Sequence, residues 1–242
     1  MKKYRLFLPL VALLMMGCGG SGSSKKPADT TPEPLAVYDF SEFIVPNHNQ
    51  INDYDVLIYN KEAENNYTMS RDYDYLREYK YEDNNTIIIS HDDEEQEKII
   101  FSNNDIIIEN LLILDEKISL NKNISVGDVI FAELKDETIE AYIGKRDSTC
   151  SITDHLNEMI VDDEDVYSNI LEQTCTSNFN ASIVLTEDLN STREDKFIIV
   201  KYFAKDIGEI SSISEECIII KVGTEVESNK CIKIETVLHS LR

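Results

Sequence analysis

Glycine and recognisable catalytic patterns are both scarce in this chain. Only eight of its 242 residues are glycine, and four of these lie within the first 22 residues. The remainder has too few glycines for a phosphate-binding loop, in which glycines let backbone N–H groups approach phosphate. The four histidines stand outside any G-x-S-x-G or H-E-x-x-H pattern. Carboxylates are so abundant that no pair can be singled out, so we predict no catalytic residue.

Basic charge is also in short supply. The chain holds 23 Lys and Arg against 46 Asp and Glu, for a net charge of −23. Residues 1–17 contain three of the basic residues and no acid, so a chain without them would carry a net charge of −26. Such a surface repels the phosphates of nucleic acids and anionic lipid headgroups. We therefore do not expect nucleic acid as a partner.

The cysteines lack the spacing of a metal site. Beyond Cys18 they are Cys150, Cys175, Cys217 and Cys231, and no C-x-x-C pair occurs, which makes zinc the weaker interpretation. An even number of cysteines in an exported chain favours two disulfides. Three pairings are open. We predict the sequential one, Cys150 with Cys175 and Cys217 with Cys231, because it closes the shortest loops.

Two acidic clusters, residues 92–95 and 162–165, raise the question of calcium. An EF-hand loop needs a glycine at its sixth position and acids at alternate positions, and neither cluster has that glycine. Each is better interpreted as a solvated loop of an acidic chain. We predict no metal and no cofactor.

The amino terminus carries the strongest signal in the sequence. Lys2, Lys3 and Arg5 precede an apolar run at residues 6–14, which is too short to cross a bilayer as a stable helix and is typical of a signal peptide. Residues 14–18, Leu-Met-Met-Gly-Cys, resemble the lipobox of bacterial lipoproteins, although two methionines stand where an aliphatic and a small residue are usual. The resemblance implies cleavage after Gly17 and a diacylglycerol on Cys18, with acylation of the new amino terminus. The alternative is an ordinary secretory signal with a chance cysteine.

Residues 18–35 are small, polar and proline-containing, as expected of a flexible tether behind the lipidated cysteine. Fully extended, they would reach roughly 50 Å. Gly19, rather than Asp, follows the cysteine, which in some bacteria permits transfer to the outer membrane. We expect a protein held to a membrane of the bacterial cell envelope by its lipid, with the periplasmic face of the outer membrane favoured and the cell surface as the alternative.

Residues 36–242 are predicted to form a single β-rich extracytoplasmic domain. Short runs of β-branched and aromatic residues alternate with turn signals every eight to twelve residues, among them Asn84-Asn85 and Asn103-Asn104. This pattern predicts an all-β fold, an antiparallel meander forming a sandwich or a curved half-barrel. Residues 152–159 are the one candidate for a short helix, and residues 166–173 are ambiguous. Residues 197–203 are almost all apolar on both sides and predict a strand buried on both faces.

Residues 202–210, Tyr-Phe-Ala-Lys-Asp-Ile-Gly-Glu-Ile, carry a second resemblance. They are similar to a tyrosine–alanine–glycine strand-turn-strand found in assorted bacterial lipoproteins of unknown function. Asp206 stands where those proteins usually have another glycine. The resemblance implies an envelope location and β architecture, and it brings no known activity.

Alternate residues of the segment 73–81 form an aromatic stripe: Tyr73, Tyr75, Arg77, Tyr79 and Tyr81. Side chains two apart share one face of a strand. One interpretation is an aromatic platform with a central cation, suited to a glycan or a peptide. The other is a ladder of packed tyrosines, which is the commoner role of such a stripe. It is nevertheless the best candidate for a ligand face.

These observations favour a lipid-anchored envelope protein with a non-enzymatic binding or structural role, whose partner is an envelope protein or a glycan. Two other functions stay open. A carrier of lipid or lipoprotein would have a half-barrel with an apolar cavity. An envelope hydrolase would assemble scattered acids and a histidine in a cleft.

Overall fold

The computed structural model describes residues 35–242, apart from residues 64–65, 111–116, 163–164 and 187–188. The predicted signal peptide, Cys18 and the tether up to residue 34 lie outside the described residues. Residues 35–242 form one compact unit. No helix in the described part of the chain has the length and hydrophobicity of a membrane span.

The described chain is almost entirely β-strand, as predicted. Its first half forms β1 (Tyr38–Asp39), α1 (Ser41–Ile44), β2 (Gln50–Ala63), β3 (Asn66–Asp83), β4 (Thr86–His91), β5 (Glu94–Phe101), β6 (Asp105–Asn110) and β7 (Lys117–Asn121). Its second half forms β8 (Asn123–Ile124), β9 (Val129–Ile139), β10 (Tyr142–Val161), β11 (Asp165–Thr186), β12 (Leu189–Ala204), β13 (Gly208–Val222) and β14 (Glu225–Leu241).

Twelve of the strands form one antiparallel sheet in the order β7-β6-β5-β4-β3-β2-β14-β13-β12-β11-β10-β9. Apart from β14 beside β2, neighbours in this sheet are also neighbours along the chain, so the predicted meander is confirmed. It is a single curled sheet rather than two stacked ones. The edge strands β7 and β9 approach each other, and β8, between them in the chain, pairs with β1. The sheet therefore nearly closes on itself.

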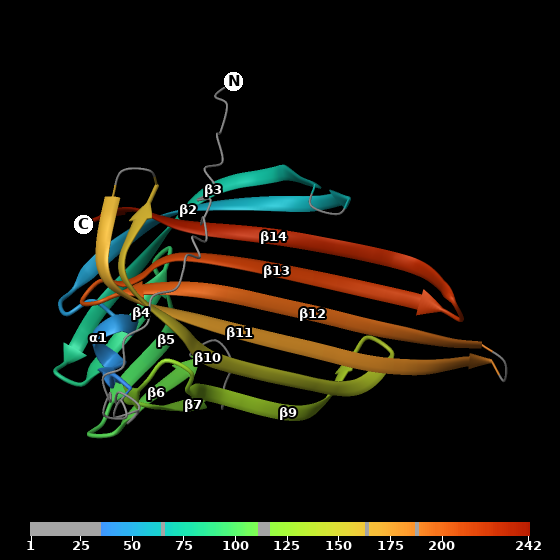
Figure 1. Cartoon of the computed structure of the whole chain (residues 1–242), viewed down its shortest axis with the longest axis horizontal. Coiled ribbons are helices and arrows are strands. Elements are labelled where there is room, and N and C mark those ends of the chain that lie inside the picture. Colours follow the sequence, from blue (N-terminus) through green and yellow to red (C-terminus); the bar gives the residue numbers. More distant parts are fainter. Residues whose placement is uncertain (1–34, 64–65, 111–116, 163–164, 187–188) are drawn as a thin grey trace, which may run out of the picture. The chain divides into compact units, whose positions relative to one another are not determined.

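The strands differ greatly in length, and this gives the sheet two unlike ends. β10 to β14 run for 15 to 22 residues, whereas β4 to β7 have five to eight. Of the 18 residues of β3, only the segment 77–83 pairs with β4. In Figure 1 the short strands accompany the long ones at the end that also holds α1. We call this the closed end and the remainder of the long strands the open end.

A plug from the start of the described chain, residues 38–46, fills the closed end. Phe40, Phe43 and Val45 are buried there in the larger of two core clusters, together with apolar residues of β4 to β7. The Phe40 ring packs edge-on against Phe203 of β12, with 6.1 Å between ring centroids. The interior of the closed end is thus a hydrophobic core contributed by both halves of the chain.

The predicted helix at residues 152–159 is wrong, because these residues belong to β10. The ambiguous segment 166–173 lies in β11 and pairs with β10, for example through Leu156 and Ile170. A bulge between Ile152 and Asp154 breaks the period-two pattern. The apolar residues Ile152, Leu156 and Met159 have the spacing of a helix, but Ile152 belongs to one core cluster, whereas Leu156 and Met159 pack against the other. The described helix is α1, four residues long.

The tip of the β10–β11 hairpin packs on the second core cluster. Val161 and Ile170 of the hairpin meet Tyr54 of β2, Ile210 of β13 and Leu238 of β14 there. Both core clusters lie within residues 38–238. Residues 35–242 therefore contain the packing that the fold needs, and we expect them to fold without the preceding residues.

The prediction that residues 197–203 are buried on both faces is wrong. Ile198, on the outer face of β12, is 43% exposed, and Phe197 and Ile199 are only half-buried. Alternation places Phe197 and Ile199 on the same face as Lys201 and Phe203, which face the interior of the closed end. These residues are exposed because β12 is long and continues into the open end. The short strands cover its inner face only at the closed end.

The cysteines pair as predicted. Cys150 is bonded to Cys175 between opposed positions of β10 and β11, and Cys217 to Cys231 between β13 and β14. Each disulfide therefore ties together two strands that already lie side by side.

Reduction is expected to destabilise the domain without abolishing its strand pairing. For sequence separations of 25 and 14 residues, loop-closure entropy predicts a loss of about 3 kcal/mol per disulfide. Urea denaturation with and without reductant measures this loss. A variant with all four cysteines replaced by serine should be indifferent to reductant. Alkylation of the four thiols in unreduced, denatured protein would contradict the pairing.

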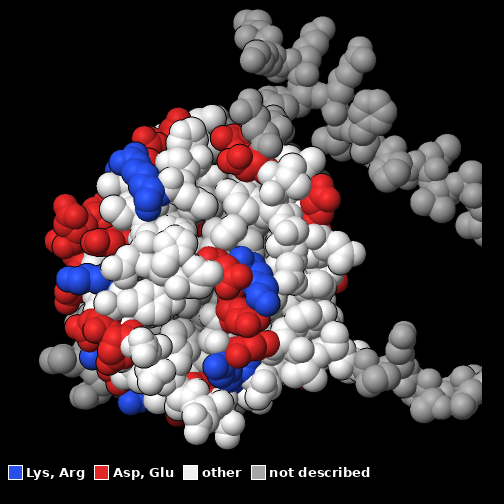
Figure 2. All heavy atoms as spheres, turned by 90° about the vertical axis from the view of Figure 1, so that its left-hand side faces the viewer, with Lys and Arg blue, Asp and Glu red and all other residues white. Residues whose placement is uncertain are grey.

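The surface at the closed end is acidic. Figure 2, which views the left-hand side of Figure 1, shows several groups of Asp and Glu side chains on this face, with Lys and Arg lying singly among them and other residues over most of the remaining surface. On this face the basic side chains do not gather into a patch. An anionic molecule approaching it meets mainly like charge.

Candidate functional site

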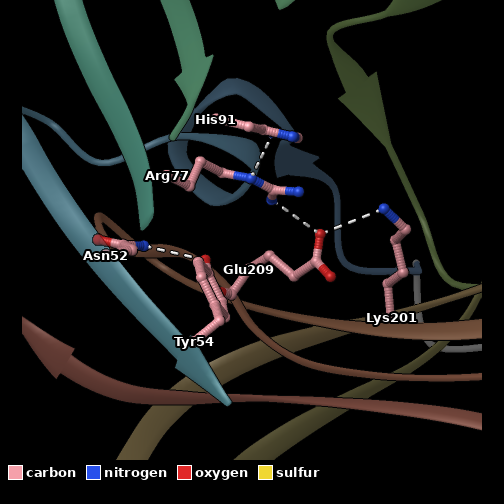
Figure 3. A network of polar contacts seen from close by, with 6 residues as sticks. All are labelled: Asn52, Tyr54, Arg77, His91, Lys201 and Glu209. Carbon is pink, nitrogen blue, oxygen red and sulfur yellow. Dashed lines mark hydrogen bonds and ion pairs between the residues drawn. The ribbon is translucent and has the colours of Figure 1, made fainter. Parts of the chain in front are cut away.

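Three charged side chains meet inside the closed end: Arg77 of β3, Lys201 of β12 and Glu209 of β13. Arg77 Nη1 and Lys201 Nζ each lie 3.2 Å from the same oxygen, Glu209 Oε2. The cations approach the carboxylate from opposite sides (Figure 3). The side chains are 16%, 30% and 5% exposed, respectively. We call these three residues the charge cluster.

The β12–β13 turn places Glu209 in this cluster. β12 ends at Ala204 and β13 begins at Gly208, so the strand-turn-strand pattern of this segment is present. Asp206 and Gly208 have φ of +64° and +92°, the left-handed conformation that favours glycine. Glu209 then pairs with Phe203, while Ser211 pairs with Tyr202. Ile210 is the extra residue of this bulge, and it turns Glu209 from the outer face to the inner face.

Glu209 and Arg77 are both ionised at neutral pH. Burial alone favours the protonated form of Glu209, but Lys201 and Arg77, together with a hydrogen bond from Ser212, outweigh it and lower the pKa to about 2. Burial disfavours the charged form of Arg77, yet Tyr79 and Glu209 raise its pKa well above the usual value. The cluster therefore carries one more positive than negative charge in a poorly solvated place.

His91 joins the cluster as a neutral acceptor. Its Nε2 accepts a hydrogen bond from Arg77 Nε at 3.1 Å (Figure 3). Burial and the neighbouring Arg77 lower the pKa of His91 to about 4. The imidazole adds no charge at pH 7, and the nitrogen that would act as a general base is occupied by Arg77.

Polar side chains of β2 form a chain of hydrogen bonds that ends at the backbone of Glu209. The Tyr54 hydroxyl donates a hydrogen bond of 2.7 Å to the Glu209 carbonyl, and Asn52 Nδ2 donates to the Tyr54 oxygen at 3.0 Å. Gln50 in turn donates to Asn52. These contacts are buried, so they hold the start of β13 in position without exchange with water.

The charge cluster forms part of the wall of a cavity of about 260 Å³. Most of the wall is apolar and comes from the plug, the short strands and β12. It includes Phe40, Ile89, Ile99, Ile118, Leu120 and Phe203. Glu97 of β5 and Gln173 of β11 add polar groups. An apolar cavity with a few convergent polar groups is typical of a small-molecule site.

The five residues of the aromatic stripe run from the surface into the interior and do not form one open platform. Tyr73 is 39% exposed, with Arg71 over its ring, and Tyr75 stacks on Tyr54 at 5.1 Å. Arg77 belongs to the charge cluster, and the Tyr81 hydroxyl donates to the Pro46 carbonyl at 2.6 Å.

Tyr79, the remaining member of the stripe, is 1% exposed and lines the cavity. Among the residues that the structure describes, its hydroxyl has no hydrogen-bond partner. A buried hydroxyl without a partner is costly, and native proteins contain few of them.

Sequence reasoning named Arg77 but missed Lys201 and Glu209. Lys201 is the single charged residue in the apolar run 197–204, which is a signal that such a residue is held inside. Nothing in the sequence indicates that Glu209 faces inward, because its orientation depends on the bulge at Ile210.

One group of potential metal-ligating side chains lies away from the cavity. Glu215, Cys217 and Cys231 come within ligand distance of one another. The two sulfur atoms are joined in a disulfide and are not thiolates. This arrangement therefore does not offer the donors that a metal site of this kind requires.

Comparisons with protein-family models, curated proteins and solved structures found no match. The fold and site define an all-β protein with a partly charged interior cavity.

Proposed function

We propose that this chain is a lipid-anchored protein of the bacterial cell envelope that binds a small, largely apolar molecule in the cavity of its closed end, without catalysing a reaction. The cavity carries this proposal. Its volume of about 260 Å³ lies just below the range of about 300–1,000 Å³ that is usual for ligand pockets, which favours a small ligand. At roughly 30 Å³ for a group the size of water, it accommodates about nine non-hydrogen atoms.

The envelope location rests on the amino terminus and the cysteines. The leader and the lipobox resemblance imply export and a lipid on Cys18. The two disulfides support an oxidising compartment, since they are rare in the reducing cytosol. The periplasmic face of the outer membrane and the cell surface both satisfy these requirements.

Lipidation has a direct test. In bacteria grown with an alkyne-tagged fatty acid, the full chain should become labelled and should sediment with membranes. The Cys18→Ser variant should stay unlabelled, because the thioether cannot form. An unlabelled wild-type chain would remove the anchor from the proposal.

Ligand binding is testable with 1-octanol, a neutral probe that matches the cavity in size. At about 0.8 kcal/mol for each buried CH₂, seven methylenes contribute roughly 5–6 kcal/mol, so we expect a Kd of about 0.1–1 mM for residues 35–242. Calorimetric titration measures it. The variant Ile118→Trp should abolish binding by filling the cavity.

The control for that experiment is Ile198→Trp, which adds the same side chain to the exposed outer face of β12. It should bind 1-octanol like the wild type. If the cavity-filling variant binds equally well, the probe occupies another place and the cavity is not the site.

A further inference from the structure

We propose that the ligand is a small anionic amphiphile, whose carboxylate or equivalent group is held by Arg77, Lys201 and Tyr79 while its apolar chain lies along the wall of the cavity. This inference rests on the proposed function, because it requires the cavity to be a binding site. It adds the chemical class of the ligand and names the groups that recognise it.

The first support is the imbalance of charge in the cluster. Two cations share one oxygen of one carboxylate, Glu209 Oε2, at 3.2 Å each. An excess positive charge in a poorly hydrated interior is costly unless an anion comes close to it. Both cations line the cavity, and neither is fully buried by protein. A ligand carboxylate beside Arg77 and Lys201 would therefore complete the neutralisation that Glu209 begins.

The second support is independent of charge. Tyr79 lines the same cavity, is 1% exposed, and has a hydroxyl without a partner among the described residues. That hydroxyl lies beside Gly208, since a Cβ built on Gly208 would be 3.5 Å from it. It is therefore next to the residue that precedes Glu209. A carboxylate oxygen bound here would accept the hydrogen bond that the protein itself leaves unmade.

The rest of the wall suits an alkyl chain. The short strands contribute Ile89, Ile99, Ile118 and Leu120, which line the cavity together with Phe203 of β12. One wall residue argues in the other direction: Glu97 of β5 is a partly exposed carboxylate that would favour a cationic group. The experiment must therefore compare both signs of charge.

Three eight-carbon probes separate these possibilities: octanoate, 1-octanol and octylammonium. We expect residues 35–242 to bind octanoate at pH 7 about tenfold or more tighter than 1-octanol, as charge-assisted hydrogen bonds exceed neutral ones, and to bind octylammonium most weakly. Calorimetric titration gives all three constants. Lys201→Met, which removes the charge and keeps most of the length of the side chain, should remove most of the preference for octanoate.

Tyr79→Phe is the sharper variant because it removes only the unpaired hydroxyl. Tyr79→Phe should weaken the binding of octanoate about fivefold and leave the binding of 1-octanol unchanged. It should keep or raise the melting temperature of the protein. The matched control is Tyr81→Phe, whose hydroxyl is already bonded to Pro46. That variant should keep the full preference for octanoate.

The outcomes distinguish this inference from the function on which it rests. If no probe binds, the proposed function fails and the inference fails with it. If 1-octanol binds as tightly as octanoate, the cavity binds ligands but the anionic class is wrong. If Tyr79→Phe leaves octanoate binding unaffected, Tyr79 does not hold the carboxylate and the inferred binding mode is wrong. Tightest binding of octylammonium would assign recognition to Glu97 instead. Should Lys201→Met fail to fold, the two tyrosine variants decide.

Discussion

Replacing Glu209 with glutamine is expected to lower the free energy of unfolding by about 3 kcal/mol or more, since removing one partner of a buried ion pair leaves its charge uncompensated. Here two cations lose the same partner, Arg77 and Lys201, each 3.2 Å from the Glu209 carboxylate. Urea denaturation of residues 35–242 measures the loss. A second variant, Glu209→Gln with Arg77→Met, should recover part of it by removing one of the stranded charges.

The matched control is Glu215→Gln. Glu215 also pairs with a lysine, Lys61 at 3.2 Å, but these side chains are 34% and 29% exposed. Partly exposed pairs contribute little, so this change should cost at most about 1 kcal/mol. Equal losses in the two variants would show that the charge cluster is no more buried than a surface pair.

Glu209→Gln should also change how the free energy of unfolding depends on pH. The pKa of Glu209 is about 2 in the folded protein, against the usual 4.5. Because the folded-state value is the lower one, the unfolded chain takes up a proton first as the solution is acidified. The stabilisation of the fold by ionised Glu209 is therefore complete above pH 4.5. It is lost as pH falls toward 2, by an amount on the order of 3 kcal/mol. Glu209→Gln should lack this loss in unfolding measured across that pH window.

Truncating the plug is the second change with a large expected effect. Phe43→Ala should destabilise the domain by about 3–5 kcal/mol, the usual cost of removing a buried phenylalanine ring. Phe43 is 2% exposed and lies in the main core cluster. The loss would be measured by urea denaturation. Hydrogen exchange should also become faster in β4 to β7, whose apolar side chains pack in the same cluster as Phe43.

Val37→Ala serves as the control for the plug. Val37 lies one residue before β1 and is 67% exposed, so the change should stay within about 0.5 kcal/mol. A small effect of Phe43→Ala, comparable with this control, would mean that the closed end is held by the sheet alone and that residues 38–46 are not a structural plug.

Much of the local structure was predictable because it depends on neighbouring residues. Asn84-Asn85 forms the turn between β3 and β4, and Asn103 and Asn104 lie between β5 and β6. Sequential cysteine pairing follows from the meander, in which consecutive strands lie side by side. The two errors, at residues 152–159 and 197–203, have different causes. Residues 197–203 were expected to be buried on both faces, but β12 extends beyond the short strands, which leaves Ile198 43% exposed. Residues 152–159 resembled a helix because apolar residues that contact two different core clusters happen to have helical spacing.

The candidate site was only partly predictable. Arg77 and Tyr79 stood out because the aromatic stripe has a period of two, yet the pattern does not say which face of β3 is buried. Lys201 and Glu209 lie more than 120 residues further along the chain. The bulge at Ile210, which turns Glu209 inward, is a feature of register between β12 and β13 and has no local signature.

The sequence by itself predicted most of the strands and the turns between them, because each depends on contacts between residues close in the chain. It favoured the sequential pairing of the four cysteines, which closes the shortest loops, without excluding the other two pairings. Only the tertiary structure decided that the sheet curls until β7 approaches β9, that residues 38–46 fill its closed end, and that one carboxylate faces two cations there. Curvature accumulates over twelve strands, and the pairing of β14 with β2 joins the two ends of the domain. No short segment of the sequence contains that information.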